Sequence, residues 1–192
     1  MQFVVCKCVD FTAATSTLQY ATELKSEQHT KVATLTDEGG RAFLLQTDTI
    51  NIQLTMDGRA IVTPNAPMSE ACACWDAYNV NQIAERCEAW FGKALGVDVI
   101  GKRYRGLLSQ QNDVELMFND RTQFYNENGE RVEHLTPGEH WVQLMLHLQG
   151  VEVHPRLVQP KIQVVQVKIL PEPTHQECIA DCELDLTESA FI

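Results

Sequence analysis

Residues 118–170 read FNDRTQFYNENGERVEHLTPGEHWVQLMLHLQGVEVHPRLVQPKIQVVQVKIL, and this stretch decides the fold class. Apolar and polar residues alternate from Val142 to Leu148, which predicts a strand with one buried face. Asn128-Gly129 is a strong signal for a tight hairpin turn, and Pro137-Gly138 marks a second turn. Residues 161–170 predict a closing strand, in which the alternation slips at one point and a bulge fits. The segment therefore predicts strands joined by tight turns.

The first half of the chain repeats this pattern on a smaller scale. Residues 3–11 predict a strand, and Ile50 to Met56 alternate as a half-buried strand does. Asp57-Gly58 then predicts a hairpin with a return strand at 60–63. Shorter strands are expected at 31–35, 42–45, 97–100 and 104–108.

One segment has the period of a helix instead. Between residues 80 and 95 the apolar residues recur at intervals of three and four, which predicts one amphipathic helix. Asn79 or Asn81 can cap its start, and Gly96 suits the position after its end. The apolar stripe consists of Val80, Ile83, Ala84, Cys87, Trp90, Phe91, Ala94 and Leu95.

Together these signals predict a mainly β fold with one amphipathic helix. Short strands at regular spacing favour an OB-like β-barrel, with a β-sandwich as the alternative and with extra N-terminal strands. We expect a single domain over 1–170 and an acidic C-terminal tail over 171–192. No apolar run approaches the length of a signal peptide or a membrane span, so a soluble intracellular protein is expected.

The net charge of −11 is unevenly distributed along the chain. Residues 171–192 contain six acidic residues and no Lys or Arg, so the first 170 residues carry only −5. A tail of this kind competes with nucleic acid for a basic surface or binds partner proteins; the alternative is a solubilising segment. The residues proposed for partner binding are Asp181, Glu183, Asp185, Glu188 and Phe191.

No catalytic motif is present: the sequence lacks GxSxG, HExxH, GxxxxGK[ST] and GxGxxG. We therefore expect a protein that is not an enzyme and needs no cofactor. Seven cysteines in an odd number argue against a disulfide framework, and their CxC spacings differ from the usual zinc knuckles. Buried free thiols are the favoured interpretation, with a metal site as the alternative.

The densest basic cluster is Lys102-Arg103-Tyr104-Arg105, which includes an aromatic residue. Proteins that bind single strands combine cations along the backbone with aromatic rings on which bases stack. Further candidates of the same two kinds are Arg121, Tyr125 and Trp141. The alternative is a solvated strand edge, where Lys and Arg prevent edge-to-edge pairing.

The order of turns and strands from Phe118 to Leu170 resembles the closing half of OB-fold single-stranded-DNA-binding proteins from phages and large DNA viruses. The resemblance rests on Asn128-Gly129, Pro137-Gly138, the strand after it and the final strand at 163–169. The acidic tail that ends near Phe191 also resembles these proteins.

The resemblance implies a non-catalytic single-stranded nucleic-acid-binding protein of a DNA virus or phage. The alternative is a virion structural subunit, such as a minor capsid, cement or tail protein. The expected partners are single-stranded nucleic acid, and replication proteins or virion subunits through the tail. We expect an oligomer with no membrane contact, in the host cytoplasm or nucleus or packaged in a virion.

Overall fold

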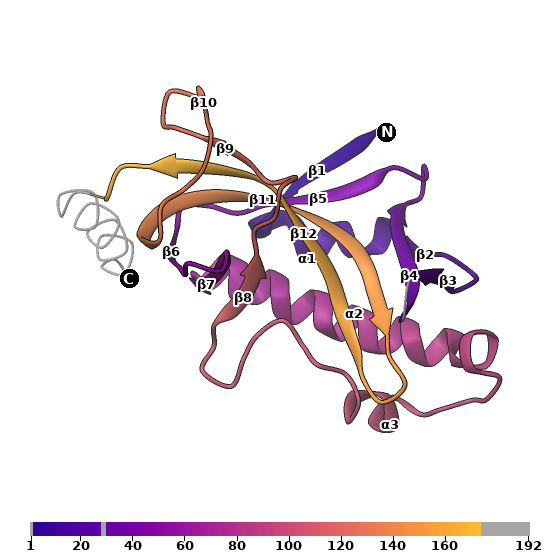
Figure 1. Cartoon of the computed structure of the whole chain (residues 1–192). Coiled ribbons are helices and arrows are strands. Elements are labelled where there is room, and N and C mark those ends of the chain that lie inside the picture. The colour runs from indigo at the N-terminus through magenta and orange to yellow at the C-terminus, as the bar shows by residue number, and fades with distance from the viewer. Residues whose placement is uncertain (1, 28–29, 174–192) are drawn as a thin grey trace, which may run out of the picture.

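The computed structural model describes residues 2–27 and 30–173 (Figure 1). The fold is mainly β, as the sequence predicts. The strands are β1 (Phe3–Lys7), β2 (Leu18–Tyr20), β3 (Lys25–Glu27), β4 (Thr30–Asp37), β5 (Ala42–Gln46), β6 (Ile50–Leu54), β7 (Arg59–Thr63), β8 (Val114–Met117), β9 (Gln123–Tyr125), β10 (Arg131–Val132), β11 (Gly138–Val153) and β12 (Val158–Leu170). The α-helices are α1 (Phe11–Ala14), α2 (Ala66–Phe91) and α3 (Val97–Gly101), and short 3-10 turns precede and follow α1.

Strand β11 organises the sheet because its 16 residues are long enough to pair with several neighbours. On one side it pairs with β12 along almost its whole length. On the other side it pairs in turn with β6, β5 and β4. The pairing of β11 with β12 shifts register between Met145 and Leu146, so Val165 has no partner and the expected bulge is present. Figure 1 shows the β11–β12 pair running across the molecule.

A buried threonine bridges the point where β11 passes from β6 to β5. Thr47 is 2% exposed and follows directly on β5. Its backbone N–H donates to the carbonyl oxygen of Leu144 at 3.0 Å, and its hydroxyl accepts from the N–H of Leu144 at 2.8 Å. The backbone groups of β11 therefore stay paired across the change of partner strand.

The sheet does not close into a barrel, and the predicted OB-like barrel is not confirmed. The strand order runs β10-β9-β12-β11-β6-β7-β8, with β4 and β5 attached through β11. Between β8 and β12 lies a segment without strand structure that makes two isolated bridges, Tyr104 with Val158 and Leu108 with Val114. The prediction of a strand at 104–108 is therefore wrong, because only single residues of this segment form β-bridges.

The prediction of one helix at residues 80–95 is wrong in its bounds and in its count. Helix α2 begins at Ala66, where the side chain of Asn65 accepts from the N–H of Met68 at 3.1 Å and Pro67 occupies the first turn. It ends at Phe91, because Gly92 adopts a left-handed conformation with φ of 70°. Residues 97–100, expected as a strand, belong to α3.

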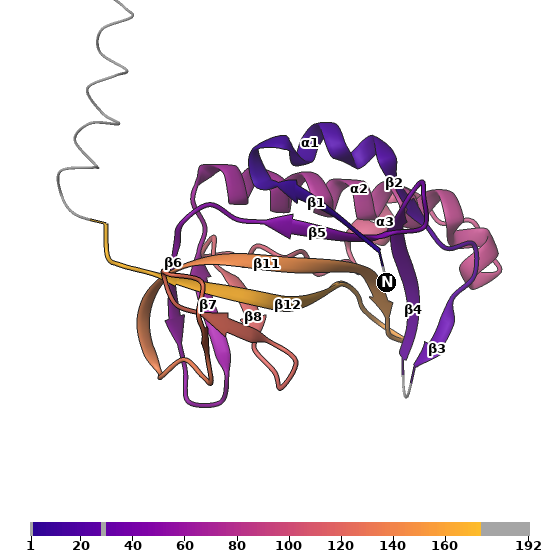
Figure 2. The ribbon, with the colours of Figure 1, turned by 90° about the horizontal axis from the view of Figure 1, so that it is seen from above.

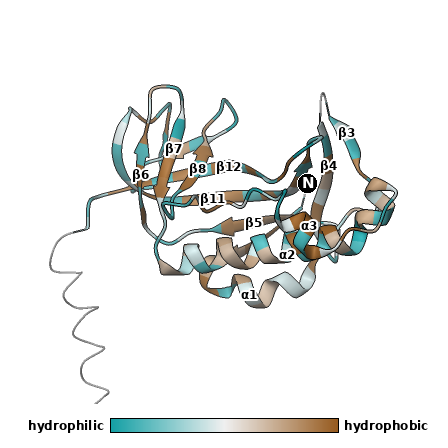
Figure 3. Cartoon of the chain, turned by 90° about the horizontal axis from the view of Figure 1, so that it is seen from below, coloured by the Kyte–Doolittle hydropathy of each residue, from teal (hydrophilic) through white to brown (hydrophobic). Residues whose placement is uncertain are grey.

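The apolar stripe of α2 starts earlier than the predicted one. Its buried residues are Met68, Ala71, Cys72, Trp75, Asn79, Ile83, Cys87 and Trp90. They meet the even-numbered residues of β11, such as Leu144 and Leu146, in one hydrophobic core. Figure 2 shows α1 and α2 on the same side of the sheet, and Figure 3 shows hydrophobic stretches in β4, β7 and β8. Within the described residues, no helix is long and apolar enough to cross a membrane.

Candidate nucleic-acid interface

The face of β11 that points away from the core is half-exposed and polar. Alternation along the strand buries Val142, Leu144, Leu146 and Leu148 and leaves the residues between them on the opposite face. The residues on this open face of β11 are Trp141, Gln143, Met145, His147 and Gln149.

Strands β12 and β9 extend the same surface, which we call the open face. Lys168 lies opposite Gln143, and Gln163 lies opposite His147. Strand β9 runs parallel to β12 and places Tyr125 beside Lys168. Amide groups both donate and accept hydrogen bonds, so this surface offers partners to the polar edges of unpaired bases.

Two hydrogen bonds show how the amides of the open face are arranged. Gln149 donates through Nε2 to Gln163 Oε1 at 2.8 Å and lies 3.4 Å from Nδ1 of His147. Burial lowers the pKa of His147, so its ring is neutral at neutral pH. The open face between β11 and β12 therefore carries dipoles rather than charge at its centre.

Three of the residues predicted from the sequence lie on or beside this face. Arg121 lines a hollow of about 730 Å³ together with His147 and Gln163. Tyr125 lines a second hollow of about 250 Å³ together with Gln143 and Lys168. Trp141 shares the face by its position on β11. Arg121 and Tyr125 come from one short segment and Trp141 comes from β11; the pairing of β9, β11 and β12 places Tyr125 and Trp141 on one face, and Arg121 and Tyr125 line different hollows there.

The other four predicted residues lie where α3 ends and β12 begins. Arg103 accepts through its carbonyl oxygen from the N–H of Val158 at 2.9 Å, and Arg105 donates its N–H to the carbonyl of Val158 at 2.8 Å. The side chains of Lys102, Arg103 and Arg105 are exposed. Arg105 lines a hollow of about 260 Å³ with Gln159 and Pro160. The backbone thus holds the two arginines beside β12.

Tyr104 points inward instead, into a hydrogen-bond network with α2. Its hydroxyl donates to Oδ1 of Asp76 at 2.8 Å and accepts from Nδ2 of Asn79 at 2.8 Å. Asp76 also accepts from the N–H of Leu107 at 2.9 Å, and Asn79 accepts from the hydroxyl of Tyr20 at 2.6 Å.

Burial raises the pKa of the three acidic members of the network, Tyr20, Tyr104 and Asp76. Gly106 leaves room for Asp76, since a Cβ on this glycine would lie 2.6 Å from Oδ2 of the carboxyl group. The network ties the segment at 104–107 to α2. We infer that Tyr104 positions its basic neighbours rather than stacking a base.

This placement predicts different results for two Tyr→Phe variants. Tyr104→Phe leaves Asp76 and Asn79 without their buried partner, and we expect a loss of about 1–3 kcal/mol in the free energy of unfolding. Tyr125→Phe is the matched control, because the Tyr125 hydroxyl lies on the open face and donates to the nearby side chain of Gln123 at 2.9 Å. Urea unfolding followed by circular dichroism measures both variants. Equal stability of the two variants would contradict the buried role of Tyr104.

A cleft that sequence reasoning missed lies at one end of the molecule. It is a cavity of about 520 Å³, and we call it the cationic cleft. Four cations line it: Lys31, Lys93, Arg103 and Arg156. They come from β4, the loop after α2, the segment after α3 and the turn between β11 and β12. No pattern of neighbouring residues could show their convergence.

The described cysteines show free thiols rather than disulfides. Within residues 2–27 and 30–173, no three His, Cys, Asp or Glu side chains are grouped to hold a metal ion. The five described cysteines are free, and burial raises the pKa of Cys8 and Cys72 to about 12. The remaining cysteines and the proposed partner-binding tail lie outside the described residues, namely Cys178, Cys182, Asp181, Glu183, Asp185, Glu188 and Phe191.

Among solved structures, the chain is similar to the single-stranded DNA-binding protein from bacteriophage Enc34. In the complex of that protein with ssDNA, the similarity covers 78% of this chain and 94% of the phage chain, with 10% identity and a TM-score of 0.43. For the C-terminal truncation of that protein, the similarity covers 83% of this chain and 98% of the phage chain, with 10% identity and a TM-score of 0.46. These matches are to the class of protein that the sequence resemblance indicated.

A search of curated proteins finds no match to this sequence. A family model does match, over residues 47–181, and its description is a family of unknown function, DUF5871. Since the matched residues make up well over half of this chain, the chain belongs to the DUF5871 family.

Proposed function

We propose that the protein binds single-stranded nucleic acid without catalysing a reaction, as a protein of a DNA virus or phage. One observation carries the proposal. Three predicted arginines line three hollows that border successive parts of β12: Arg103 at Val158, Arg105 at Gln159 and Pro160, and Arg121 at residues 161–163. A row of cations beside one strand suits the repeated charge of a phosphate backbone.

The open face supplies the second element of such a site. Its amides offer hydrogen bonds to base edges, and the rings of Tyr125 and Trp141 offer surfaces for stacking. Both interactions need bases that are neither paired nor stacked on each other, so we propose a single strand rather than a duplex as the ligand. Lys102, Arg103, Arg105 and Arg121 neutralise phosphates in this proposal.

Much of the negative charge of the chain lies away from the open face, although Glu27, Asp120 and Glu152 line the hollow that contains Arg121. Six of the acidic residues fall in 171–192, outside the segments that form the open face. Competition between that tail and nucleic acid stays a prediction. No observation on the described residues favours the alternative of a virion subunit.

Fluorescence titration with a mixed-sequence oligonucleotide tests the proposal. Trp75 and Trp90 are 1% and 6% exposed, so Trp141 is the tryptophan that a stacked base would quench. Tyr125→Leu removes a stacking ring, and we expect a loss of affinity of about 5- to 150-fold, since stacking contributes about 1–3 kcal/mol per base. Tyr125→Phe keeps the ring and should bind as the unmodified protein does.

The competitor in this titration is a duplex of the same sequence. We expect it to bind more weakly than the single strand at every salt concentration. Equal affinity for the two forms, or no binding of either at low salt, would contradict the proposal.

A further inference from the structure

The cationic cleft has features that a phosphate backbone alone does not require. We propose that it is a pocket for one nucleotide, whose phosphate is bound by the cations and whose base lies against Phe91. This inference goes beyond strand binding, because only Arg103 of the cleft belongs to the surface assigned above.

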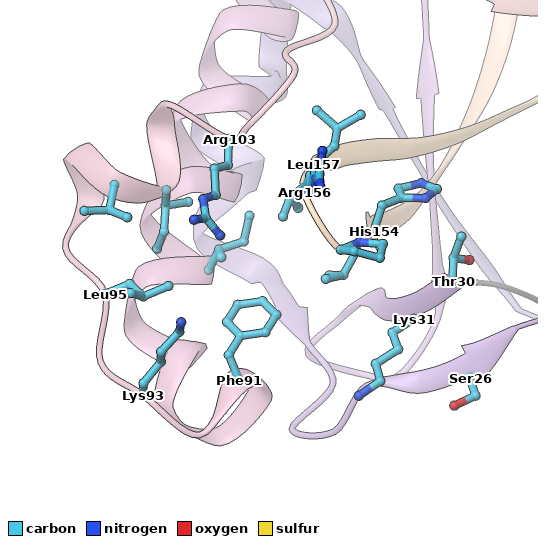
Figure 4. A pocket seen from close by; sticks show the side chains of 16 residues that line it. Ser26, Thr30, Lys31, Phe91, Lys93, Leu95, Arg103, His154, Arg156 and Leu157 are labelled. Atoms are coloured by element: carbon cyan, nitrogen blue, oxygen red, sulfur yellow. The ribbon is translucent and has the colours of Figure 1, made fainter.

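The walls of the cleft converge from distant parts of the chain. Figure 4 shows Lys93 and Arg103 on the same side of the cleft, from the loop after α2 and the segment after α3, with the ring of Phe91 beside Lys93. Lys31 extends toward the same space from β4. A volume of about 520 Å³ lies within the usual range for small-molecule pockets, which is roughly 300–1,000 Å³.

The charges of the cleft are unbalanced. Among the residues that the structure describes, no Asp or Glu lines the cleft, and none of the four cations has a carboxylate oxygen within 4.0 Å. The nearby acids Glu27 and Glu152 form ion pairs with Lys161 instead. Cations held together in this way repel one another, and a bound anion removes that repulsion.

The rest of the lining is apolar and includes an oriented aromatic ring. Leu95, Val99 and Leu157 line the cleft with Phe91. The ring of Phe91 packs edge-on against Trp90, with 6.3 Å between the ring centroids, and this contact limits its rotation. Inorganic phosphate would leave this apolar surface unused, and a purely apolar ligand would leave four cations unneutralised. A nucleotide matches both parts.

Such a nucleotide can be free in solution or can be the end of a strand. The chemistry is the same, so the test includes both forms. The probes are dAMP, deoxyadenosine, inorganic phosphate, and a tetranucleotide with either a 5′-phosphate or a 5′-hydroxyl group. Isothermal titration calorimetry on the full chain measures each affinity.

We expect dAMP to bind at least about tenfold more tightly than deoxyadenosine or inorganic phosphate, since one charge-assisted hydrogen bond or one stacked base contributes about that factor. Phe91→Leu and the double variant Lys93→Gln/Arg156→Gln should each lower dAMP affinity about tenfold or more. The matched controls are Phe3→Leu and Lys7→Gln, an exposed aromatic and an exposed cation on β1, and both should leave dAMP affinity unchanged.

The ligand is the strand end if the protein prefers the 5′-phosphorylated tetranucleotide and the double variant loses this preference. The ligand is a free nucleotide if dAMP binds tightly and this preference is absent. The inference is wrong if dAMP binds no more tightly than inorganic phosphate, or if neither cleft variant changes its affinity. Tyr125→Leu should weaken strand binding but not dAMP binding, so the two proposals can fail separately.

Discussion

Gly150→Ala is expected to destabilise the protein more than any other single change that we consider. Gly150 lies in β11 opposite Thr34, where β11 passes from β5 to β4. Its φ of 128° is strained for any residue with a side chain. A Cβ there would lie 1.9 Å from the carbonyl oxygen of Ala33 and 3.0 Å from the backbone nitrogen of Leu35. Both contacts are with the backbone of β4, which cannot rotate away.

Backbone strain and overpacking each cost about 1–3 kcal/mol, so the expected loss is about 2–6 kcal/mol. A typical domain has only about 5–15 kcal/mol in total, and urea unfolding should therefore show a much lower midpoint or no folded baseline. Gly129→Ala is the first control, because its φ is 80° but a Cβ there meets nothing within 4 Å. It should cost about 1–2 kcal/mol from strain alone.

Gly101→Ala is the second control, because a Cβ there also meets nothing within 4 Å and its backbone is not strained. We expect a change within about 0.5 kcal/mol. If Gly150→Ala and Gly129→Ala cost the same, the close approach of β11 to β4 contributes nothing, and our explanation is wrong.

The triple variant Lys102→Ala/Arg103→Ala/Arg105→Ala is expected to lose most of its affinity for single strands at low salt. Each neutralised phosphate contributes about −0.7 to the slope of log K against log[salt], so three contacts contribute about −2. If the affinities converge near 1 M salt, this slope corresponds to a loss of roughly 500-fold at 0.05 M and roughly 30-fold at 0.2 M. All three side chains are exposed, so the fold should tolerate their removal.

The salt series also separates a local contact from an effect of net charge. The control Lys7→Ala removes an exposed cation from β1, away from β12. It should leave the slope unchanged. A slope that is equally steep in the triple variant and in the unmodified protein would remove these three residues from the binding site.

Local signals in the sequence determined the turns and the strands beside them. Asn128-Gly129 forms the turn between β9 and β10, and Asp57-Gly58 forms the turn between β6 and β7. In both turns the glycine has a positive φ, which a side chain would disfavour, so the two residues alone specify the hairpin. The alternation from Val142 to Leu148 likewise identified the buried face of β11. Period two fixes which side chains face the core, whatever the neighbouring strands are.

Helix boundaries were predicted less well than strands, because prolines and short apolar runs each occur in more than one kind of structure. The sequence pattern predicts a helix only from residue 80, after a segment that contains two prolines, whereas Pro67 lies in the first turn of α2, where a proline is tolerated. Likewise, the apolar residues of 97–100 fit a short buried strand by composition, and only packing against α2 and the adjacent loop makes them a helix.

The direction of Tyr104 and the composition of the cationic cleft were decided by the tertiary structure alone. Alternation along a strand would have placed Tyr104 with Lys102 on one face, but the segment is not a strand, and Asp76 and Asn79 draw the hydroxyl inward. The cleft joins Lys31 to Arg156 across most of the chain. Residues so far apart meet only because β4, the end of α2 and the β11–β12 turn reach the same end of the sheet, and local sequence patterns carry no information about contacts of that range.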